Sequence, residues 1–270
     1  MNTLYLDLET YSEIPIQWGV YNYAAACEIM LVAYACDDGP VDVTDWTRAD
    51  WARAGPKHLA ALTADAGRIV THGNFDRVVL DAQGLPWPRS RYDSTLARAL
   101  AHSLPGGLDK LCAILRVPPE LAKVGEGKDL VQLFCKPQPE NRKIRRATRA
   151  THPEQWAQFV RYAGHDVLAM REVDRRLPRW NWTEGEKALY DLDQQINDYG
   201  VQVDVDLAAA IREQAQAAAD AMNARVQTLT GGAVSAATER DRMLAHLLRE
   251  YGVDLPDLKA GTLERRLDDE

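Results

Sequence analysis

The sequence predicts an α/β domain followed by a smaller, all-helical segment. Up to about residue 180, short apolar runs typical of strands are mixed with patterns typical of helices. Beyond Pro178 the patterns are almost all helical. Because runs of one kind of element tend to pack together as one unit, this change predicts a division into residues 1–180 and residues 181–270.

Four stretches of the first part alternate or run apolar as strands do, and they are residues 1–10, 29–35, 41–46 and 68–72. The first places three leucines on one face and Tyr5, Asp7 and Glu9 on the other, because successive side chains of a strand point to opposite sides. The second and third are joined by the turn signal Asp-Asp-Gly-Pro, which predicts a hairpin. The stretch from Thr10 to Ala26 is predicted to be a polar loop.

The predicted helices of the first part are residues 56–65, 77–82, 96–103, 108–115 and 153–177. Asp93 is well placed as the N-cap of the third of these helices. The last helix is the most regular, since its apolar residues follow i, i+3, i+4, i+7 spacing. Tyr162 and Asp166 are four residues apart and lie together along one border of its apolar stripe. The predicted helices of the second part are residues 184–199, 206–229 and 238–251.

Composition and charge disfavour several classes of protein. The formal net charge of -8 argues against a protein that coats nucleic acid by bulk electrostatics, although a local basic groove is compatible with it. The four cysteines show no C-x-x-C spacing, so reduced thiols in a cytosolic protein are expected rather than a zinc or redox site. No signal peptide is visible, and no apolar run approaches the ~18 residues that span a bilayer, so we expect a cytoplasmic protein without a membrane partner.

Acidic residues occur at three points that matter for chemistry. Asp7 and Glu9 stand side by side on the first strand, Asp76 follows the fourth strand, and Asp166 lies on the long helix one turn after Tyr162. Two carboxylates held close together repel each other unless a cation lies between them, and magnesium prefers oxygen ligands. Each acid taken alone also has an ordinary interpretation as a solvated strand end, a favourable charge at a helix N-terminus or an ion-pair partner.

Taken in order, these residues resemble the three exonuclease motifs of the DEDD superfamily, in its tyrosine-bearing branch. The three motifs are Asp7-Leu8-Glu9-Thr10, Asn74-Phe75-Asp76 and Tyr162-Ala163-Gly164-His165-Asp166. The histidine-bearing branch would need a histidine at position 161, where this sequence has Arg161. Further stretches resemble phage family A DNA polymerases, and they are residues 4–10, 19–24, 28–34, 127–137, 182–186 and 196–204. The resemblance implies a ribonuclease H-like exonuclease domain over residues 1–180 and the start of a polymerase thumb over residues 181–270.

The resemblance also implies a reaction, namely two-metal-ion hydrolysis of the terminal phosphodiester at a single-stranded DNA 3′ end, as in polymerase proofreading. The product would be a nucleoside 5′-monophosphate. Asp7, Glu9 and Asp166 would hold the first of two magnesium ions, and Asp7 would bridge to the second with help from Asp76; manganese is expected to substitute. Tyr162 would orient the attacking water, because a phenol with a pKa of ~10 is a poor base at neutral pH.

Substrate contacts and partners are implied with less detail. Thr10 and Asn74 flank the acids and are expected to touch the terminal nucleotide. Six basic residues between Lys136 and Arg149 predict either a clamp on the strand backbone or a solvated loop. The polymerase palm and fingers have no counterpart in this sequence, so we expect them as missing partners, in the host cytoplasm if the source is a phage. The alternatives are an RNA-trimming exonuclease of the same superfamily and a catalytically silent DNA-binding module.

Overall fold

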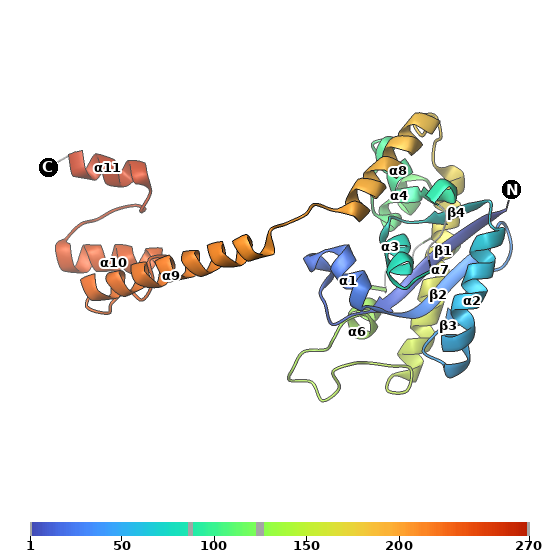
Figure 1. Ribbon diagram of the computed structural model, residues 1–270, viewed down its shortest axis with the longest axis horizontal. Helices are drawn as coiled ribbons and strands as arrows, with labels where there is room; N and C mark the ends of the chain where they lie inside the picture. The colour runs from blue at the N-terminus through green and yellow to red at the C-terminus, as the bar shows by residue number, and fades with distance from the viewer. Residues whose placement is uncertain (1, 86–88, 123–126, 269–270) are drawn as a thin grey trace. The chain divides into compact units, whose positions relative to one another are not determined.

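The computed structural model describes residues 2–85, 89–122 and 127–268 of the chain. The chain forms two compact units, Met1–Asp198 and Tyr199–Glu270, and each is described by itself. The first unit contains the sheet, whereas the described part of the second contains helices alone (Figure 1).

Five strands form one mixed sheet in the order β3-β2-β1-β4-β5. Their bounds are β1 (Thr3–Tyr11), β2 (Glu28–Cys36), β3 (Asp42–Asp45), β4 (Arg68–Thr71) and β5 (Tyr92–Ser94). The central strand β1 pairs antiparallel with β2 and parallel with β4, while β3 is antiparallel to β2 and β5 is parallel to β4. The predicted α/β class and the four predicted strands are confirmed, and the arrangement is compatible with a ribonuclease H-like fold.

The strand β5 explains why the predicted capping role of Asp93 is wrong. The N-cap of α4 (Thr95–Ala101) is Ser94, whose hydroxyl accepts the backbone N–H of Ala97 at 3.2 Å. Asp93 lies in β5, and its carboxylate accepts a hydrogen bond from Nε of Arg68 on the neighbouring strand at 2.9 Å. A charged partner therefore holds this carboxylate within the sheet, and the next residue caps the helix.

The helices of the first unit, within the described residues, are α1 (Val20–Ala26), α2 (Ala49–Asp65), α3 (Phe75–Ala82), α4 (Thr95–Ala101), α5 (Leu108–Ile114), α6 (Gly127–Phe134), α7 (Pro153–Arg176) and α8 (Glu184–Tyr199). The prediction of a polar loop from Thr10 to Ala26 is wrong in its second half, because α1 buries Tyr23 and Ala24. The helix α2 begins before the predicted start at Pro56, which it accommodates at the loss of one backbone hydrogen bond.

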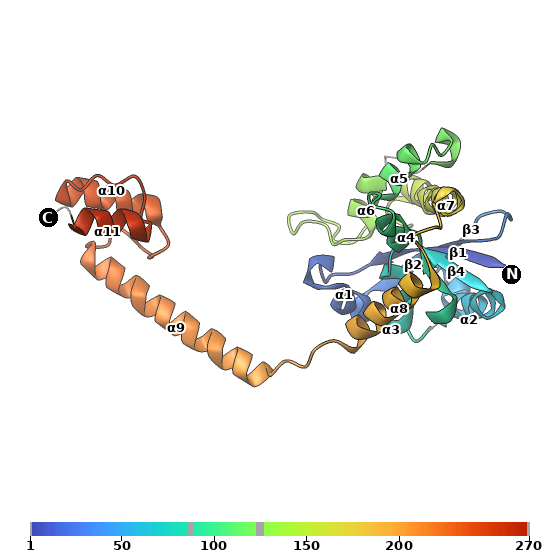
Figure 2. The same cartoon turned by 90° about the horizontal axis from the view of Figure 1, so that it is seen from above.

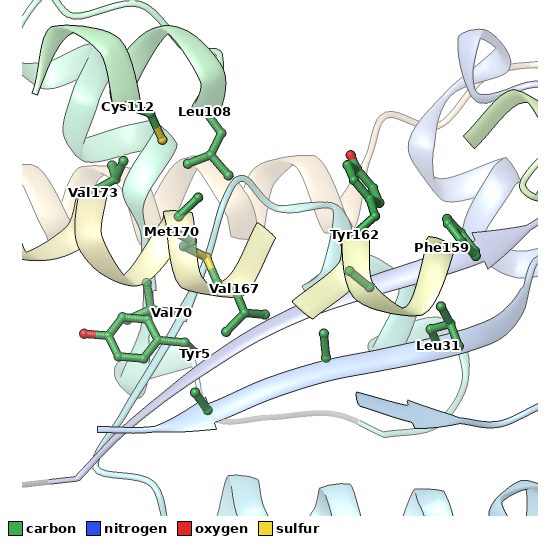
Figure 3. Close-up of a cluster of buried hydrophobic side chains, with 14 of the residues drawn as sticks. Tyr5, Leu31, Val70, Leu108, Cys112, Phe159, Tyr162, Val167, Met170 and Val173 are labelled. Atoms are coloured by element: carbon green, nitrogen blue, oxygen red, sulfur yellow. The ribbon is translucent and has the colours of Figure 1, made fainter. Parts of the chain in front are cut away.

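The sheet lies between two layers of helices (Figure 2). The helix α7 covers one face together with α5 and α6, and α1, α2 and α3 lie on the other. The buried side chains between α7 and the sheet confirm the predicted apolar stripe, and Figure 3 labels among them Tyr5, Leu31, Val70, Phe159, Val167, Met170 and Val173. The leucines of β1 at positions 4, 6 and 8 pack on the opposite side with α2 and α3. Because side chains alternate along a strand, Asp7 and Glu9 face α7.

The helix α8 is held to the rest of the first unit by an ionic cluster around the buried guanidinium of Arg77. The guanidinium of Arg77 on α3, whose side chain is 1% exposed, donates to both carboxylate oxygens of Asp198 at 2.9 Å. Tyr21 donates to the same carboxylate at 2.7 Å, and Arg89 also forms an ion pair with it. The predicted division after residue 180 would assign this helix to the second segment, whereas the compact units divide after Asp198.

The second unit contains α9 (Val205–Leu229), α10 (Arg240–Tyr251) and α11 (Ala260–Asp268). The carboxylate of Asp204 caps α9 by accepting the backbone N–H of Leu207 at 2.9 Å. The chain turns after this helix at Gly231, whose φ of +57° is a conformation that glycine adopts readily. Both helices predicted here are confirmed, and α11 is an addition. Within the described ranges, no helix combines the length and the apolar character needed to cross a membrane.

Candidate metal centre

Three carboxylates from two elements converge on the α7 side of the sheet. One oxygen each from Asp7, Glu9 and Asp166 can be chosen so that all three lie within 4.8 Å of one another. Asp7 is half-buried, whereas Glu9 and Asp166 are 8% and 7% exposed. The convergence follows from local geometry, because β1 presents its two acids toward α7 and α7 presents Asp166 toward β1.

The chemistry of this set fits a hard divalent cation. Three negative side chains held this close, two of them buried, repel one another in a medium that screens charge poorly. Carboxylate oxygens are the ligands that magnesium, manganese and calcium prefer, and an ion among them would remove the repulsion. Asp7, Glu9 and Asp166 could therefore hold a divalent metal, and their carboxylates suit any of these three ions.

Asp76 lies next to the three-acid cluster through the backbone of β1. Its carboxylate accepts the N–H of Leu8, the residue between Asp7 and Glu9, at 3.0 Å. The pairing of β1 with β4 ends at Tyr5, so α3 supplies the partner for this later N–H. Asp76 is 3% exposed, and its burial raises its pKa to about 7, although the N–H of Leu8 acts in the opposite direction. The fourth acid thus approaches β1 from the opposite helical layer.

A bulge in β2, where Met30 has no partner between Leu31 and Ile29, lies opposite the step from Glu9 to Thr10 of β1. The register with β2 shifts between Glu9 and Thr10. Bulges of this kind redirect side chains and are frequent beside active sites. Thr10 is 3% exposed, and its hydroxyl lies 2.8 Å from the hydroxyl of Tyr23 on α1. Thr10 therefore forms part of the wall beside Glu9, with its hydroxyl occupied by a protein partner.

Asn74 lies at the start of α3, where its side chain makes no capping hydrogen bond. It lines a cavity of about 480 Å³ together with residues of α4 and α8, including Tyr190, and with Trp182 just before α8. Glu9 and Thr10 line a different cavity. The two residues predicted to touch the terminal nucleotide thus border separate cavities.

The cavity beside Glu9 and Thr10 is a mostly apolar groove of about 520 Å³. Its described lining residues are Leu8, Glu9, Thr10, Ser12, Glu13, Ile14, Pro15, Ile16, Gln17, Tyr23, Phe75, Val131, Cys135, Lys136 and Pro137. Most of these side chains are apolar, while two acids, Glu9 and Glu13, and the exposed Lys136 contribute charge. A volume of this size is within the range of small-molecule sites.

The sequence analysis missed Cys135, which touches the acidic cluster. Its thiol lies 3.7 Å from Oε2 of Glu9, within reach of a weak S–H···O hydrogen bond. Burial raises the pKa of this thiol well above its ordinary value, and the charge of Glu9 adds to the effect. Cys135 is therefore a neutral donor to a candidate metal ligand. Cysteine spacing carried no signal for this role, since one thiol is involved.

The basic residues from 136 to 149 divide into two groups. Arg146 pairs with Glu28 at 2.8 Å and stacks over Tyr11, while Arg145 donates to the carbonyl of Gln138 at 2.9 Å. Arg142 and Lys143 instead are exposed and line a groove of about 490 Å³ that also contains Ile144 and His152. The loop between α6 and α7 is thus anchored by some of its arginines, while Arg142 and Lys143 lie exposed along this groove.

Comparison with known proteins yields a relative whose similarity extends along nearly the whole chain. No protein-family model matches. A curated protein is 33% identical over 279 residues, a match that covers 99% of this chain. It is the DNA polymerase of Bacillus phage SP02. The chain spans 42% of the length of that polymerase.

Proposed function

We propose that this chain is a metal-dependent 3′→5′ exonuclease associated with a phage-type DNA polymerase. The observation that carries the proposal is the convergence of Asp7, Glu9 and Asp166 within 4.8 Å in a chain related along its length to such a polymerase. The order and spacing of these acids with Asp76 and Tyr162 support the tyrosine-bearing DEDD branch as the superfamily.

Each residue of the site would have its own role in phosphodiester hydrolysis. A pair of divalent ions, when bound, supplies positive charge for the attacking and leaving oxygens. Asp7, Glu9 and Asp166 would hold one ion, and Asp7 and Asp76 would hold the other, with Asp76 acting through water. Magnesium is the proposed metal, and manganese would replace it. Tyr162 would accept or donate a hydrogen bond that orients the attacking water, since a phenol is too weak a base to deprotonate it near neutral pH.

The groove beside Glu9 supports a nucleotide as the group that is bound and removed. Its mostly apolar lining suits stacking of a terminal base, and Lys136 at its edge would attract a phosphate. The released product would be a nucleoside 5′-monophosphate. Thr10 would act by shaping the groove wall rather than through its hydroxyl, and Asn74 would approach the strand from the second cavity.

The exposed cations of the 136–149 loop support a binding path for single-stranded DNA upstream of the 3′ end. Arg142 and Lys143 are the members of the basic run that lie exposed along the 490 Å³ groove. Arg53 and Lys57 on α2 provide a matched pair of exposed cations in the helical layer across the sheet. Removing either pair changes the net charge equally, so comparing the two variants separates the effect of local charge on DNA binding from that of net charge.

The similarity to a phage DNA polymerase supports a proofreading role. In that role the palm and fingers of a polymerase would be the partners that pass a mispaired 3′ end to this site, in the cytoplasm of the infected host. The second unit would correspond to the beginning of the thumb.

The proposal is tested by incubating the protein with a 5′-labelled single DNA strand and magnesium or manganese. The wild-type protein is expected to produce a ladder of progressively shorter strands, and the Asp7→Ala/Glu9→Ala variant none. A parallel RNA strand separates the DNA exonuclease from an RNA-trimming enzyme of the same superfamily. Binding of DNA without shortening, at every metal concentration, would instead support a silent DNA-binding module.

A further inference from the structure

We propose that Gly127, the first residue of α6, is a positioning residue that seats the ring of Tyr162 for the exonuclease reaction. This inference rests on the proposed function, because it assigns to Gly127 an effect on the hydroxyl of Tyr162. Neither residue spacing nor the resemblance assigns a role to this glycine.

The backbone of Gly127 lies directly against the Tyr162 ring. A Cβ atom added to Gly127 would lie 1.9 Å from Cε2, 2.4 Å from Cζ and 2.6 Å from Cδ2 of Tyr162. The atom Cζ carries the hydroxyl, so the contact lies at the end of the ring that would act on water. Gly127 is absent from the residues with positive φ, so close approach rather than backbone conformation requires a glycine here.

The other contacts of the ring leave it little freedom to move. Tyr162 is 9% exposed, and its ring is parallel to that of Phe159, with an interplanar angle of 7° and centroids 6.4 Å apart. Phe134 at the far end of α6 stacks on Phe159 at 5.1 Å. The helix α6 therefore contacts α7 at both ends, with Gly127 on Tyr162 and Phe134 on Phe159. Figure 3 shows the Tyr162 ring extending from α7 away from the strands.

An alanine at position 127 must therefore displace the ring or the start of α6. Ordinary van der Waals contact begins at 3.4 Å, whereas the added carbon would lie at 1.9 Å, so the contact must open by about 1.5 Å. A misplacement of about 1 Å near a reacting group can reduce a rate about 100-fold. We expect Gly127→Ala to lower kcat by about 10- to 100-fold and to change KM less than 3-fold.

The experiment places Gly127→Ala in three backgrounds of the full chain: wild type, Tyr162→Phe and Tyr162→Ala. In the Tyr162→Phe background the ring is present without its hydroxyl, so Gly127→Ala is expected to reduce kcat less than 3-fold further. Thermal melting is the second measurement. Gly127→Ala should lower the Tm in the wild-type and Tyr162→Phe backgrounds but not in Tyr162→Ala, where the space of the ring is free.

Gly261→Ala on α11 is the matched control, because nothing lies within 4 Å of an added Cβ there, and it should leave kcat unchanged and should not lower the Tm. A wild-type kcat in Gly127→Ala, or an equal loss of kcat in the Tyr162→Phe background, would overturn the positioning role. If Gly127→Ala fails to fold, recovery of folding by Tyr162→Ala supports the contact, and continued misfolding contradicts it. Absence of nuclease activity in the wild-type chain would overturn the proposed function, while the melting series would test the contact independently.

Discussion

The buried carboxyl of Asp76 makes the metal-free protein sensitive to pH in a direction that can be stated in advance. Its pKa is about 7 in the folded protein against an ordinary value of 3.8, because burial disfavours the charged form. The folded protein therefore binds this proton more tightly than the unfolded chain does. The stability associated with it is fully present below pH 3.8 and is lost progressively as the pH rises through about 7.

The size of this loss of stability follows from the difference between the folded and the ordinary pKa of Asp76. A pKa difference of about 3, at 1.36 kcal/mol for each unit, corresponds to about 4 kcal/mol of unfolding free energy above pH 7. The Asp76→Asn variant keeps an oxygen that can accept the N–H of Leu8 and cannot ionise. With EDTA present, we expect this variant to be more stable than wild type by up to about 4 kcal/mol at pH 8 and nearly equal to it at pH 4.

Urea unfolding followed by tryptophan fluorescence measures this difference. All seven tryptophans precede residue 199, so the signal reports on the first unit. Asp65→Asn, which removes an exposed carboxylate at the end of α2, is the control and should show a difference that is independent of pH. The reasoning is refuted if Asp76→Asn is no more stable than wild type at pH 8, or if its advantage is the same at pH 4.

Three further predictions concern the metal, the strand and α8. Magnesium at 100 times its Kd should raise the unfolding free energy of the first unit by about 2.7 kcal/mol, and Glu9→Gln should remove most of this gain. The Arg142→Gln/Lys143→Gln variant should raise KM for long single strands and lower the salt slope of DNA binding by about 1.4. Its hydrolysis of a substrate without a strand, the p-nitrophenyl ester of thymidine 5′-monophosphate, should be unchanged. An equal effect on KM from replacing Arg53 and Lys57 of α2 by glutamine would contradict a local role of the loop cations. Asp198→Ala should cost about 3 kcal/mol by fluorescence-monitored unfolding, because Arg77 would remain buried without its main partner, and a loss below about 1 kcal/mol would contradict this.

The central strand and the long helix could be predicted because their patterns are local. Alternation along residues 1–10 places Asp7 and Glu9 on one face, and a spacing of four places Tyr162 beside Asp166. Both relations hold in any context that preserves the strand and the helix. The convergence of Asp166 on the two acids of β1 needed the order of motifs in the resemblance, since periodicity alone does not say which elements meet.

Features that depend on distant partners could not be predicted in this way. Asp93 has the sequence context of a helix cap, yet Arg68 from another strand binds its carboxylate. The assignment of α8 depends on Arg77 and Asp198, which are 121 residues apart. Gly127 begins one of the stretches that resemble phage polymerases, but the sequence assigns it no role, because its close contact is with a ring that belongs to α7. In each case tertiary contact decides a role that local preference leaves open.

The position of β1 at the middle of the sheet explains how acids from both helical layers can act at one place. Asp7 and Glu9 project toward α7 and Asp166, while the backbone N–H of Leu8 between them is bound by Asp76 from α3 on the other side. Since Asp7, Glu9 and Asp166 come from two segments far apart in the chain, the fold of the first unit is what brings these three acids together, with Asp76 bound to the backbone beside them. Metal binding should therefore stabilise the folded state with little competition from the unfolded chain, while the burial of the Asp76 carboxyl is the reason that the metal-free protein should lose stability as the pH rises.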